Sequence, residues 1–518
     1  MESSAHPFFM PSNALVTGVA FLATTIVLRV IWNLRLSPLA RQRIPGPWYA
    51  AISDIWYGWH GVTCDRTPAL AQLFEQYGPV VRIGANRVAF NDVPTIHRIY
   101  RDFAFNKGAF FKYVTFGGKD NTVATTDPTL HGRFRRWHAP GFRGDRLRKT
   151  AIELEEQMED LVERVRSDAA DGAAVNILRI LKVHTLDMLG IALFDTKFLQ
   201  LRNREEQPIV QYNLHYLVDV ALRTSLSAGL YRVAQLIPVK ALRDVFAADT
   251  NICNFCSKLY DAAPDEPTDS DAMNLMAAGK HYRDPTTGEA ESKEQVVAEM
   301  AAFLLGGTDG SSVVLTYLLY ELARQPKIYN HARAEMETMN DVYNIDALRA
   351  LPYLNAFLKD CLRVRNPLGV FIERIIPADK SAALSGYHIP GGTVVGGSAW
   401  STGRIQSLFP DPERIDPERW VTMTSSSDGA GTWRERDDIP TADMNAAWWS
   451  FGLGVRACVG RPLAEVEILQ TLAAVISNFR LRLHESTTEE SMGPQDLTVI
   501  GPRARKCLLY FDHHPINA

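Results

Sequence analysis

A short segment near the C-terminus combines a cysteine with glycine, arginine and aromatic residues at fixed spacing. It reads FGLGVRACVG and fills all five fixed positions of the pattern FxxGxRxCxG: Phe451, Gly454, Arg456, Cys458 and Gly460. With residue usage near one in twenty, such a match arises by chance on the order of once in ten thousand chains of this length. A merely buried cysteine is therefore a poor explanation of the segment.

The chemistry of the segment depends on where Cys458 lies. A helix is expected to open at Gly460, and its free N–H groups and the positive end of its dipole stabilise a thiolate over a thiol. Gly454 has no Cβ, which lets the loop turn sharply and come close to a flat macrocycle. Arg456 can reach a propionate of such a group while Phe451 packs beside the sulfur. We interpret Cys458 as the thiolate ligand of a haem iron.

The segment resembles the cysteine loop of the cytochrome P-450 family, the haem-thiolate monooxygenases, and the chain is similar to their microsomal, fungal-like type. The resemblance covers nearly the whole chain after the N-terminus. It implies haem b as cofactor, with Cys458 pushing electron density onto the iron and favouring O–O cleavage. It also implies a mainly α-helical cytochrome P-450 fold with a small β-sheet region. The haem would lie between the helix that bears Thr308 and the helix after Cys458.

Three more cations resemble the residues that bind the haem propionates in this family. His131 and Arg135 lie four residues apart in LHGRFRRW and share one face of a predicted helix. Arg374 comes directly after an apolar run. Their joint spacing with Arg456 favours a propionate site over unrelated surface charges.

A pair of opposite charges marks the predicted helix over residues 346–363. Asp360 and Arg363 stand where the family has ExxR, and residues three apart on a helix can pair. The resemblance implies that Arg419 completes a buried ion network with a structural role. The aspartate is one methylene shorter than the usual glutamate, so the geometry of the network is expected to differ.

A glycine-rich stretch, FLLGGTDGSS from Phe303 to Ser312, resembles the family's oxygen-binding helix, except that Gly310 replaces the catalytic threonine. Three glycines in five positions cost a helix roughly 3 kcal/mol relative to alanine, so a purely structural helix is a poor explanation. Gly306 and Gly307 are expected to open a groove over the iron. Asp309 is expected to feed protons through water.

Gly310 has no hydroxyl to deliver the proton that splits O–O, and three accounts are open. Ser311 or Thr308 supplies the hydroxyl after a local register shift, a substrate hydroxyl or an ordered water supplies it, or the reaction needs no such proton. Because Asp309 is retained, we favour delivery by Ser311 or water. The last account would make the chain a haem-thiolate enzyme that rearranges, dehydrates or closes rings without net oxygen insertion. A non-catalytic haem-binding protein is a further alternative.

Apolar side chains near these motifs are predicted to line a substrate pocket. They come from the loop before His131, from the glycine-rich helix and from the segment before Arg374. They are Phe110, Phe111, Tyr113, Phe116, Phe303, Leu304, Gly307, Leu368, Val370 and Phe371. The function that the resemblance implies is hydroxylation or another oxidation of a lipophilic small molecule, such as a terpenoid, steroid or polyketide of secondary metabolism.

The N-terminus predicts a membrane anchor. Ala14 to Trp32 is nearly long enough to span a bilayer, and its one charge, Arg29, lies near the end, where it can snorkel. Three arginines and a Pro-Gly-Pro break follow, so the positive-inside rule places the body in the cytosol. We predict an anchor over residues 1–43, with one transmembrane helix at about 14–32, and a catalytic domain over residues 44–518 at the endoplasmic reticulum membrane.

The composition of the chain bears on which molecules it can bind. The chain has 518 residues, a net charge of −4 and a pI of about 6.4, which gives no case for nucleic acid. The resemblance implies electrons from NADPH through NADPH-cytochrome P-450 reductase, with cytochrome b5 as a further candidate donor. Arg133 and Arg136 would face the reductase. The amphipathic stretch from Leu226 to Val239 is expected to dip into the membrane, from which a lipophilic substrate would enter.

The remaining pattern predicts a helical body with few strands. Alternation over residues 80–90 and 386–395 predicts two short hairpins, and residues 261–271 and 425–431 read as polar loops. Helical periodicity is expected over residues 150–258, 292–338, 346–363 and 461–479, followed by a C-terminal strand pair.

Overall fold

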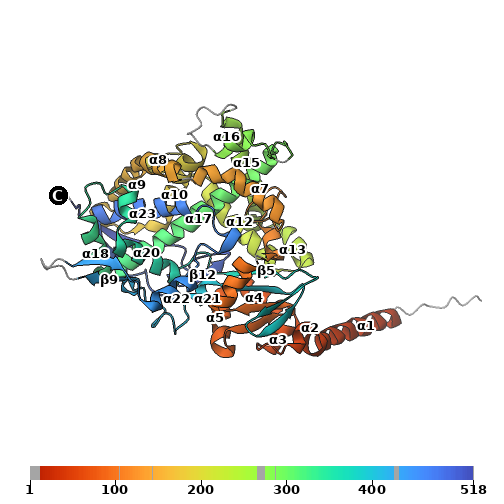
Figure 1. The fold of residues 1–518 in the computed structure, drawn as a ribbon. Coiled ribbons are helices and arrows are strands. Elements are labelled where there is room, and N and C mark those ends of the chain that lie inside the picture. The colour runs from red at the N-terminus through yellow and green to blue at the C-terminus, as the bar shows by residue number, and fades with distance from the viewer. Residues whose placement is uncertain are drawn as a thin grey trace, which may run out of the picture.

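The body of the molecule is mainly helical (Figure 1). The structure, a computed structural model, describes residues 12–103, 105–142, 144–264, 275–285, 287–424 and 431–516, so the polar loops predicted at 261–271 and 425–431 lie mostly outside it.

The longer helices of the body are α5 (Arg66–Tyr77), α7 (Pro128–His138), α8 (Gly144–Glu153), α9 (Glu155–Asp168), α10 (Ile177–Phe194), α12 (Ile209–Ser225), α15 (Ala248–Ala262), α17 (Lys293–Arg324), α18 (Pro326–Met336), α20 (Pro352–Val364) and α23 (Arg461–Asn478). Shorter helices are α2 (Pro38–Arg41), α3 (Trp48–Ile52), α4 (Ile55–Val62), α6 (Val93–His97), α11 (Gln200–Asn203), α13 (Ala228–Gln235), α14 (Lys240–Phe246), α16 (Leu275–His281), α19 (Ile345–Arg349), α21 (Ala399–Thr402) and α22 (Ile439–Ala447).

Helical turns of other pitch connect these helices. They are η1 (Trp32–Leu36), η2 (Arg98–Asp102), η3 (Ala109–Tyr113), η4 (Ala139–Phe142), η5 (Ala170–Gly172), η6 (Pro417–Arg419) and η7 (Gly454–Arg456). The predicted helical segments are confirmed as mainly helical, although residues 150–258 form several helices interrupted by η5, the short strand β4 (Val175–Asn176) and connecting loops. Further breaks lie between α17 and α18 and between α19 and α20. Each of these two breaks comes just before a proline, Pro326 and Pro352, which starts the next helix without needing an N–H partner.

The largest sheet has the strand order β1-β2-β8-β5-β3. The strands of the molecule are β1 (Val80–Gly84), β2 (Arg87–Phe90), β3 (Asn106–Lys107), β4 (Val175–Asn176), β5 (Phe371–Ile375), β6 (Ser381–Leu384), β7 (Tyr387–Pro390), β8 (Val394–Ser398), β9 (Val421–Thr424), β10 (Thr432–Glu435), β11 (Phe479–Leu483), β12 (Pro494–Leu497), β13 (Val499–Pro502) and β14 (Leu508–His513). β1 and β2 form the predicted hairpin, and β11 pairs with β14 near the C-terminus as expected.

The second predicted hairpin, over residues 386–395, is wrong. β7 pairs with β6, while β8 pairs with β2 and β5 in the large sheet. The turn between β6 and β7 explains this, because Ser385 and Gly386 have φ of +46° and +81°. Two consecutive left-handed residues form the tight turn whose twist suits a hairpin.

α17 runs through the middle of the body (Figure 1) and packs against both α10 and α23. The Ser292 side chain caps its start by accepting a hydrogen bond from the N–H of Gln295, and the helix ends at Arg324, just before Pro326. Nearly every residue from Val313 to Leu322 is buried, as expected of a helix that is apolar all round. α17 is long and apolar enough to cross a membrane, but most of it is buried inside the body.

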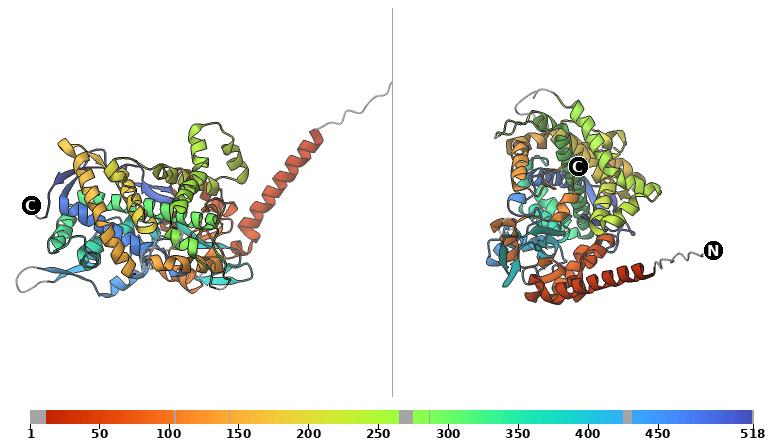
Figure 2. Two further views of the ribbon diagram at one scale, coloured as in Figure 1. Left: turned by 90° about the horizontal axis from the view of Figure 1, so that it is seen from above. Right: turned by 90° about the vertical axis from the view of Figure 1, so that its right-hand side faces the viewer.

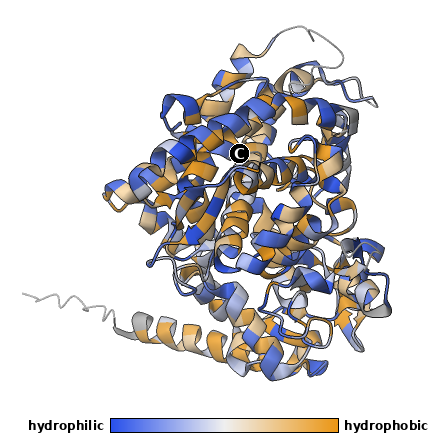
Figure 3. Cartoon of the chain, turned by 90° about the vertical axis from the view of Figure 1, so that its left-hand side faces the viewer, coloured by the Kyte–Doolittle hydropathy of each residue, from blue (hydrophilic) through white to orange (hydrophobic). Residues whose placement is uncertain are grey.

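The N-terminal helix α1 (Ser12–Ile31) leaves the body as a separate rod (Figure 2). Apolar residues follow one another along it (Figure 3), and the helix over residues 16–41 is apolar and long enough to cross a membrane, with 6% of its 18-residue apolar window buried. These properties fit a single transmembrane anchor.

The segment after α1 packs against the body. The Asn33 side chain donates a hydrogen bond to the backbone oxygen of Ile52 (2.7 Å), and Leu39 is buried in a cluster with Val80 and Phe90. The N–H of Arg82 in β1 donates to the backbone oxygen of Pro45 (2.8 Å). Packing therefore extends the body back to about Trp32, beyond the boundary predicted at residue 43.

We expect two truncated chains to differ in stability. Removing residues 1–31 should weaken binding to liposomes and leave the body intact, whereas removing residues 1–43 also deletes the buried Leu39. The longer truncation should lower the free energy of unfolding by about 2–5 kcal/mol, the range for losing a buried leucine. Urea unfolding measures this, with Leu39→Ala in the shorter truncation as the matched control. Equal stability of the two chains would contradict the packing boundary.

Candidate active site

The cysteine loop closes on itself just before α23. The N–H of Cys458 donates to the backbone oxygen of Phe451 (2.8 Å), and Gly452 and Gly454 have φ of +78° and +66°. A Cβ on Gly454 would collide with the backbone oxygen of Tyr100 in η2. A glycine is thus required here, as the sequence predicts, but its close neighbour in the structure is η2.

Cys458 is accessible to solvent, although protein atoms surround it. The next two residues, Val459 and Gly460, help to line a central cavity. Backbone N–H groups of Gly460 and Arg461, at the start of α23, donate to the sulfur, and Arg135 adds positive charge. These groups favour the thiolate, but removal from water outweighs them and raises the pKa of the thiol. A metal cation bound to the sulfur would reverse that balance, because a coordinating thiol is deprotonated outright.

The predicted cations converge near this loop. His131 and Arg374 are buried, and the polar contacts of the arginines go to backbone oxygens. Arg456 Nη1 donates to Thr125 (3.2 Å), Arg374 Nη1 to Glu373 (3.0 Å) and Arg135 Nη1 to Ala457 (3.5 Å).

A fifth cation, Lys107 in β3, belongs to the same cluster. It is buried, and its Nζ donates to the backbone oxygens of Thr122 (3.1 Å) and Val123. Burial, together with Arg456 and Arg374, lowers the pKa of Lys107 to about 6. The sequence offered no signal for this residue, because its neighbours in space come from distant segments.

The cluster of Lys107, His131, Arg135, Arg374 and Arg456, called the cation cluster below, has excess positive charge. Burial and the four other cations lower the pKa of His131 to about 3. No carboxylate of the described residues is within 4.0 Å of these cations as an ion-pair partner. The cluster is therefore suited to bind a buried anion.

One face of α17 lines the central cavity. The lining residues recur at intervals of three and four: Glu299, Ala302, Phe303, Gly306, Gly307, Gly310, Ser311 and Val314. A Cβ on Gly306 or Gly310 would meet nothing within 4 Å, so these glycines widen the cavity. A Cβ on Gly307 would instead collide with Leu189 in α10, so Gly307 also permits close helix packing.

The candidate proton donors point in different directions. Ser311 lines the cavity, and its Oγ donates to Glu467 Oε2 in α23 (3.0 Å). Burial raises the pKa of Glu467 to about 8. Asp309 faces α10, where it pairs with Lys182 Nζ (2.7 Å), and it borders a second cavity. Thr308 is buried outside the central lining, and its Oγ1 has no hydrogen-bond partner among the residues that the structure describes.

Comparison with known proteins identifies the family. A family model described as cytochrome P-450 matches residues 54–508. The chain belongs to the cytochrome P-450 family.

Curated relatives are fungal monooxygenases. The chain is 27% identical over 96% of its length to cytochrome P-450 monooxygenase aflV of Aspergillus parasiticus, of which 95% is covered. It is 27% identical over 91% of its length to tryprostatin B 6-hydroxylase of Neosartorya fischeri, of which 81% is covered. The crystal structure of the cytochrome P-450DA haem domain matches 87% of this chain and 94% of that one, with 18% identity and a TM-score of 0.69. The predicted fold is thereby confirmed, and the chain is a cytochrome P-450 monooxygenase.

The residues present fit the haem that this family implies. The cavity between α17 and α23 has open space above Gly306 and Gly310, and Cys458 opens beside it. The cation cluster supplies the positive charge that two propionates would neutralise. Haem iron with a thiolate ligand therefore matches both the family and the chemistry of this site.

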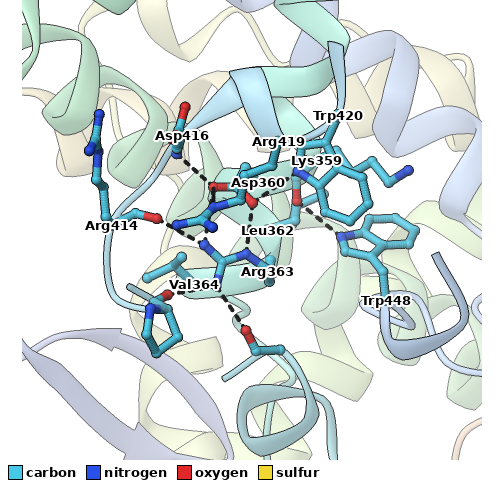
Figure 4. A network of polar contacts seen from close by, with 12 residues as sticks. Lys359, Asp360, Leu362, Arg363, Val364, Arg414, Asp416, Arg419, Trp420 and Trp448 are labelled. Carbon is cyan, nitrogen blue, oxygen red and sulfur yellow. Dashed lines mark hydrogen bonds and ion pairs between the residues drawn. The ribbon is translucent and has the colours of Figure 1, made fainter. Parts of the chain in front are cut away.

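The predicted ion network is present, with an altered third member (Figure 4). Arg363 Nε and Nη2 donate to Asp360 Oδ1 (2.7 Å) and Oδ2 (3.1 Å), and both residues are buried. Asp360 also accepts from Trp420 Nε1 (2.9 Å) and from the N–H of Asp416 (2.7 Å). Arg419 Nε is 3.9 Å from Asp360 Oδ2 and makes no hydrogen bond within the described part of the chain. The remaining side-chain hydrogen bond to the Asp360 carboxylate thus comes from the Trp420 indole, and not from the predicted Arg419.

Few of the predicted pocket residues line the cavity. Phe303, Gly307 and Leu368 do, whereas Leu304 is packed in the core and Phe116 stacks on Tyr216. Other predicted positions lie outside the lining: Phe110, Phe111, Tyr113, Val370 and Phe371. Residues that the sequence did not indicate, among them Phe142, Leu189 and Leu193, line it instead. Loop aromatics contact other side chains, and nothing in their local sequence predicts which ones.

Asp360→Asn is expected to lower the free energy of unfolding by about 3–5 kcal/mol, because Arg363 would remain buried without a counter-charge. Arg419→Gln should cost roughly 1 kcal/mol or less, because its guanidinium is only a distant partner. Urea unfolding of the two variants gives the comparison. Equal costs would show that Arg419 carries more of the network than its distance indicates.

Proposed function

We propose that this chain is a membrane-anchored haem-thiolate monooxygenase that oxidises a lipophilic small molecule of secondary metabolism, such as a terpenoid, steroid or polyketide. The observation that carries the proposal is the placement of Cys458 at the start of α23, beside a largely apolar cavity that the glycine face of α17 widens. The names of fungal relatives such as tryprostatin B 6-hydroxylase support oxidation of small molecules.

In this proposal the Cys458 thiolate would bind the haem iron, and the cation cluster would hold the propionates of haem b. When bound, haem with a thiolate ligand supplies the chemistry of O–O cleavage. Arg456 has a second role, because its contacts with Thr125 and Asp127 tie the cysteine loop to the start of α7. Gly306 and Gly310 leave room on the other side of the cavity for oxygen and substrate.

Proton delivery is assigned to Ser311 and Glu467. The serine lies next to Gly310 on the cavity face, so it needs no register shift to replace the missing threonine. With a pKa of about 8, Glu467 is mostly protonated at neutral pH. The Ser311 hydroxyl, which donates to Glu467 Oε2 in the structure, would turn toward the cavity to deliver its proton, and the acid would then replace that proton. Asp309, paired with Lys182 on another face, would act only through intervening groups. A proton donor positioned at the cavity favours oxygen insertion over rearrangement, dehydration or ring closure, which need no such proton.

Electrons would come from NADPH through NADPH-cytochrome P-450 reductase, with cytochrome b5 as a further candidate donor. Of the two arginines predicted to face a partner, Arg133 is held by Glu291 (2.7 Å), whereas the Arg136 side chain is 54% exposed. Arg136 is therefore the better candidate for contact with an acidic partner.

The proposed location is the endoplasmic reticulum membrane, with the body in the cytosol. α1 supplies the anchor, and exposed apolar side chains support a second contact with lipid. Leu230, Val233 and Leu236 of α13 are exposed, as are Ile55 and Trp59 of α4, and α4 packs on the end of α12 just before α13. This surface favours entry of a lipophilic substrate from the membrane.

The oxidation can be tested with labelled oxygen. Purified holoenzyme with reductase and NADPH is incubated with candidate lipophilic substrates under ¹⁸O₂, and products are analysed by mass spectrometry. One atom of ¹⁸O should enter the product for each NADPH consumed productively, and the other should leave as water. A product that forms at full yield without ¹⁸O would support rearrangement or dehydration instead.

Ser311→Ala and Glu467→Gln should each lower product formed per NADPH by at least about tenfold, since a positioned proton donor contributes that much or more. In the wild type this ratio should fall as pH rises above about 8, where Glu467 loses its proton, and Glu467→Gln should lack that fall. Ser312→Ala is the matched control, because its hydroxyl contacts the Asp309 backbone outside the cavity. Unchanged coupling in Ser311→Ala would remove the serine from the proton path.

A further inference from the structure

A polar cluster in the cavity wall has no part in the proposed chemistry. It joins Glu299 of α17, Thr122 of the loop before α7, and His138 at the end of α7. Thr122 Oγ1 donates to Glu299 Oε2 (2.9 Å) and lies 3.3 Å from His138 Nδ1, and His138 Nε2 is 3.5 Å from the same Glu299 oxygen. Both Glu299 and Thr122 line the central cavity.

The cluster leaves a buried polar atom without a partner. Glu299 is fully buried, yet its Oε1 makes no hydrogen bond with any described residue, and neither does His138 Nε2. An unpaired buried polar atom costs about 1–3 kcal/mol. The neighbouring lining residues Ala302 and Phe303 are apolar, so this end of the cavity contains one unsatisfied acid in an apolar wall. Such an atom is suited to a polar group brought in by a ligand.

Glu299 is also separated along α17 from the glycines. It is the first residue of the helix face that lines the cavity, seven positions before Gly306 and eleven before Gly310. At 1.5 Å per residue these separations are roughly 10 Å and 16 Å along the helix axis. A molecule that reached both ends would carry its polar group about that far from the carbon held near Gly310.

We infer that Glu299 is a specificity-determining residue that hydrogen-bonds a neutral oxygen-bearing group, a hydroxyl or a carbonyl, at one end of an otherwise apolar substrate. This rests on the proposed function and narrows its substrate class to elongated lipophiles with a polar oxygen remote from the site of oxidation. Thr122 and His138 are positioning residues that hold the carboxyl in place.

The surroundings of Glu299 favour a neutral ligand over a cationic one. Burial raises the pKa of Glu299 to about 8, and the charge of Glu291 acts in the same direction, against hydrogen bonds from Thr122 and the charge of Lys107. Burial and nearby cations lower the pKa of His138 to about 3, so the histidine is neutral. Because Oε2 accepts from Thr122, the proton of the neutral acid lies on Oε1, which can donate to an oxygen in the cavity.

Three probes of similar length test the inference by binding to the ferric holoenzyme, scored by the shift of the Soret band. They are dodecan-1-ol, tridecane and the dodecyltrimethylammonium cation. The wild type should bind the alcohol about fivefold to tenfold more tightly than the alkane, the effect of one hydrogen bond to a buried group. Glu299→Leu should abolish that preference, while Glu299→Gln, which can still donate and accept, should keep most of it.

The controls separate this inference from the proposed function. Glu335→Gln changes a half-buried carboxylate outside the cavity lining and should leave all three affinities unchanged. Thr122→Val should weaken the preference for the alcohol without affecting the alkane. The carbon monoxide difference spectrum of each variant reports haem content, and ¹⁸O incorporation tests monooxygenation independently.

Three results would overturn the inference. The first is a wild type with no preference between alcohol and alkane. The second is tightest binding of the cation, lost in Glu299→Gln, which would indicate an ionised carboxylate. The third is a Glu299→Leu variant that binds all probes more weakly to the same degree and loses haem, which would make Glu299 a structural residue.

Discussion

Positive charge buried beside an apolar cavity is the constraint on which the rest of the structure depends. Five basic side chains from α7, β3, β5 and η7 lie close together, and burial with the neighbouring charges lowers the pKa of Lys107 and His131. The hydrogen bonds of Lys107 and the three arginines go to backbone oxygens. Segments far apart in the chain meet at this cluster, and a bound anion would stabilise all of them together. Binding of an anionic cofactor there would therefore be coupled to the stability of the native fold.

The helical periodicity of α17 places residues with different roles on different faces of the helix. The cavity face has two glycines that open space, a serine with a buried acid behind it, and Glu299 at its end. The face toward α10 carries the Asp309 pair with Lys182. Replacement of the usual threonine by Gly310 thus moves the hydroxyl by one residue, to a position that still lines the cavity.

Local motifs made part of this site predictable. The cysteine loop, the helix that follows it and the Asp360–Arg363 pair depend on residues close in sequence, and the structure places them as expected. The direction of Asp309 depends on Lys182, 127 residues away, and the completion of the ion network depends on Trp420, 60 residues from Asp360. Lys107 and Glu299 show the same limit. Their roles depend on burial and on distant partners, which no short motif records.

The central claim is that Cys458 is the axial thiolate ligand of haem, and it is tested most directly by carbon monoxide binding. Reduced protein exposed to carbon monoxide should show the strongly red-shifted Soret band of thiolate-ligated haem. Cys458→Ala should lose that band. A wild-type band without the red shift, or the same red-shifted band in Cys458→Ala, would contradict the account.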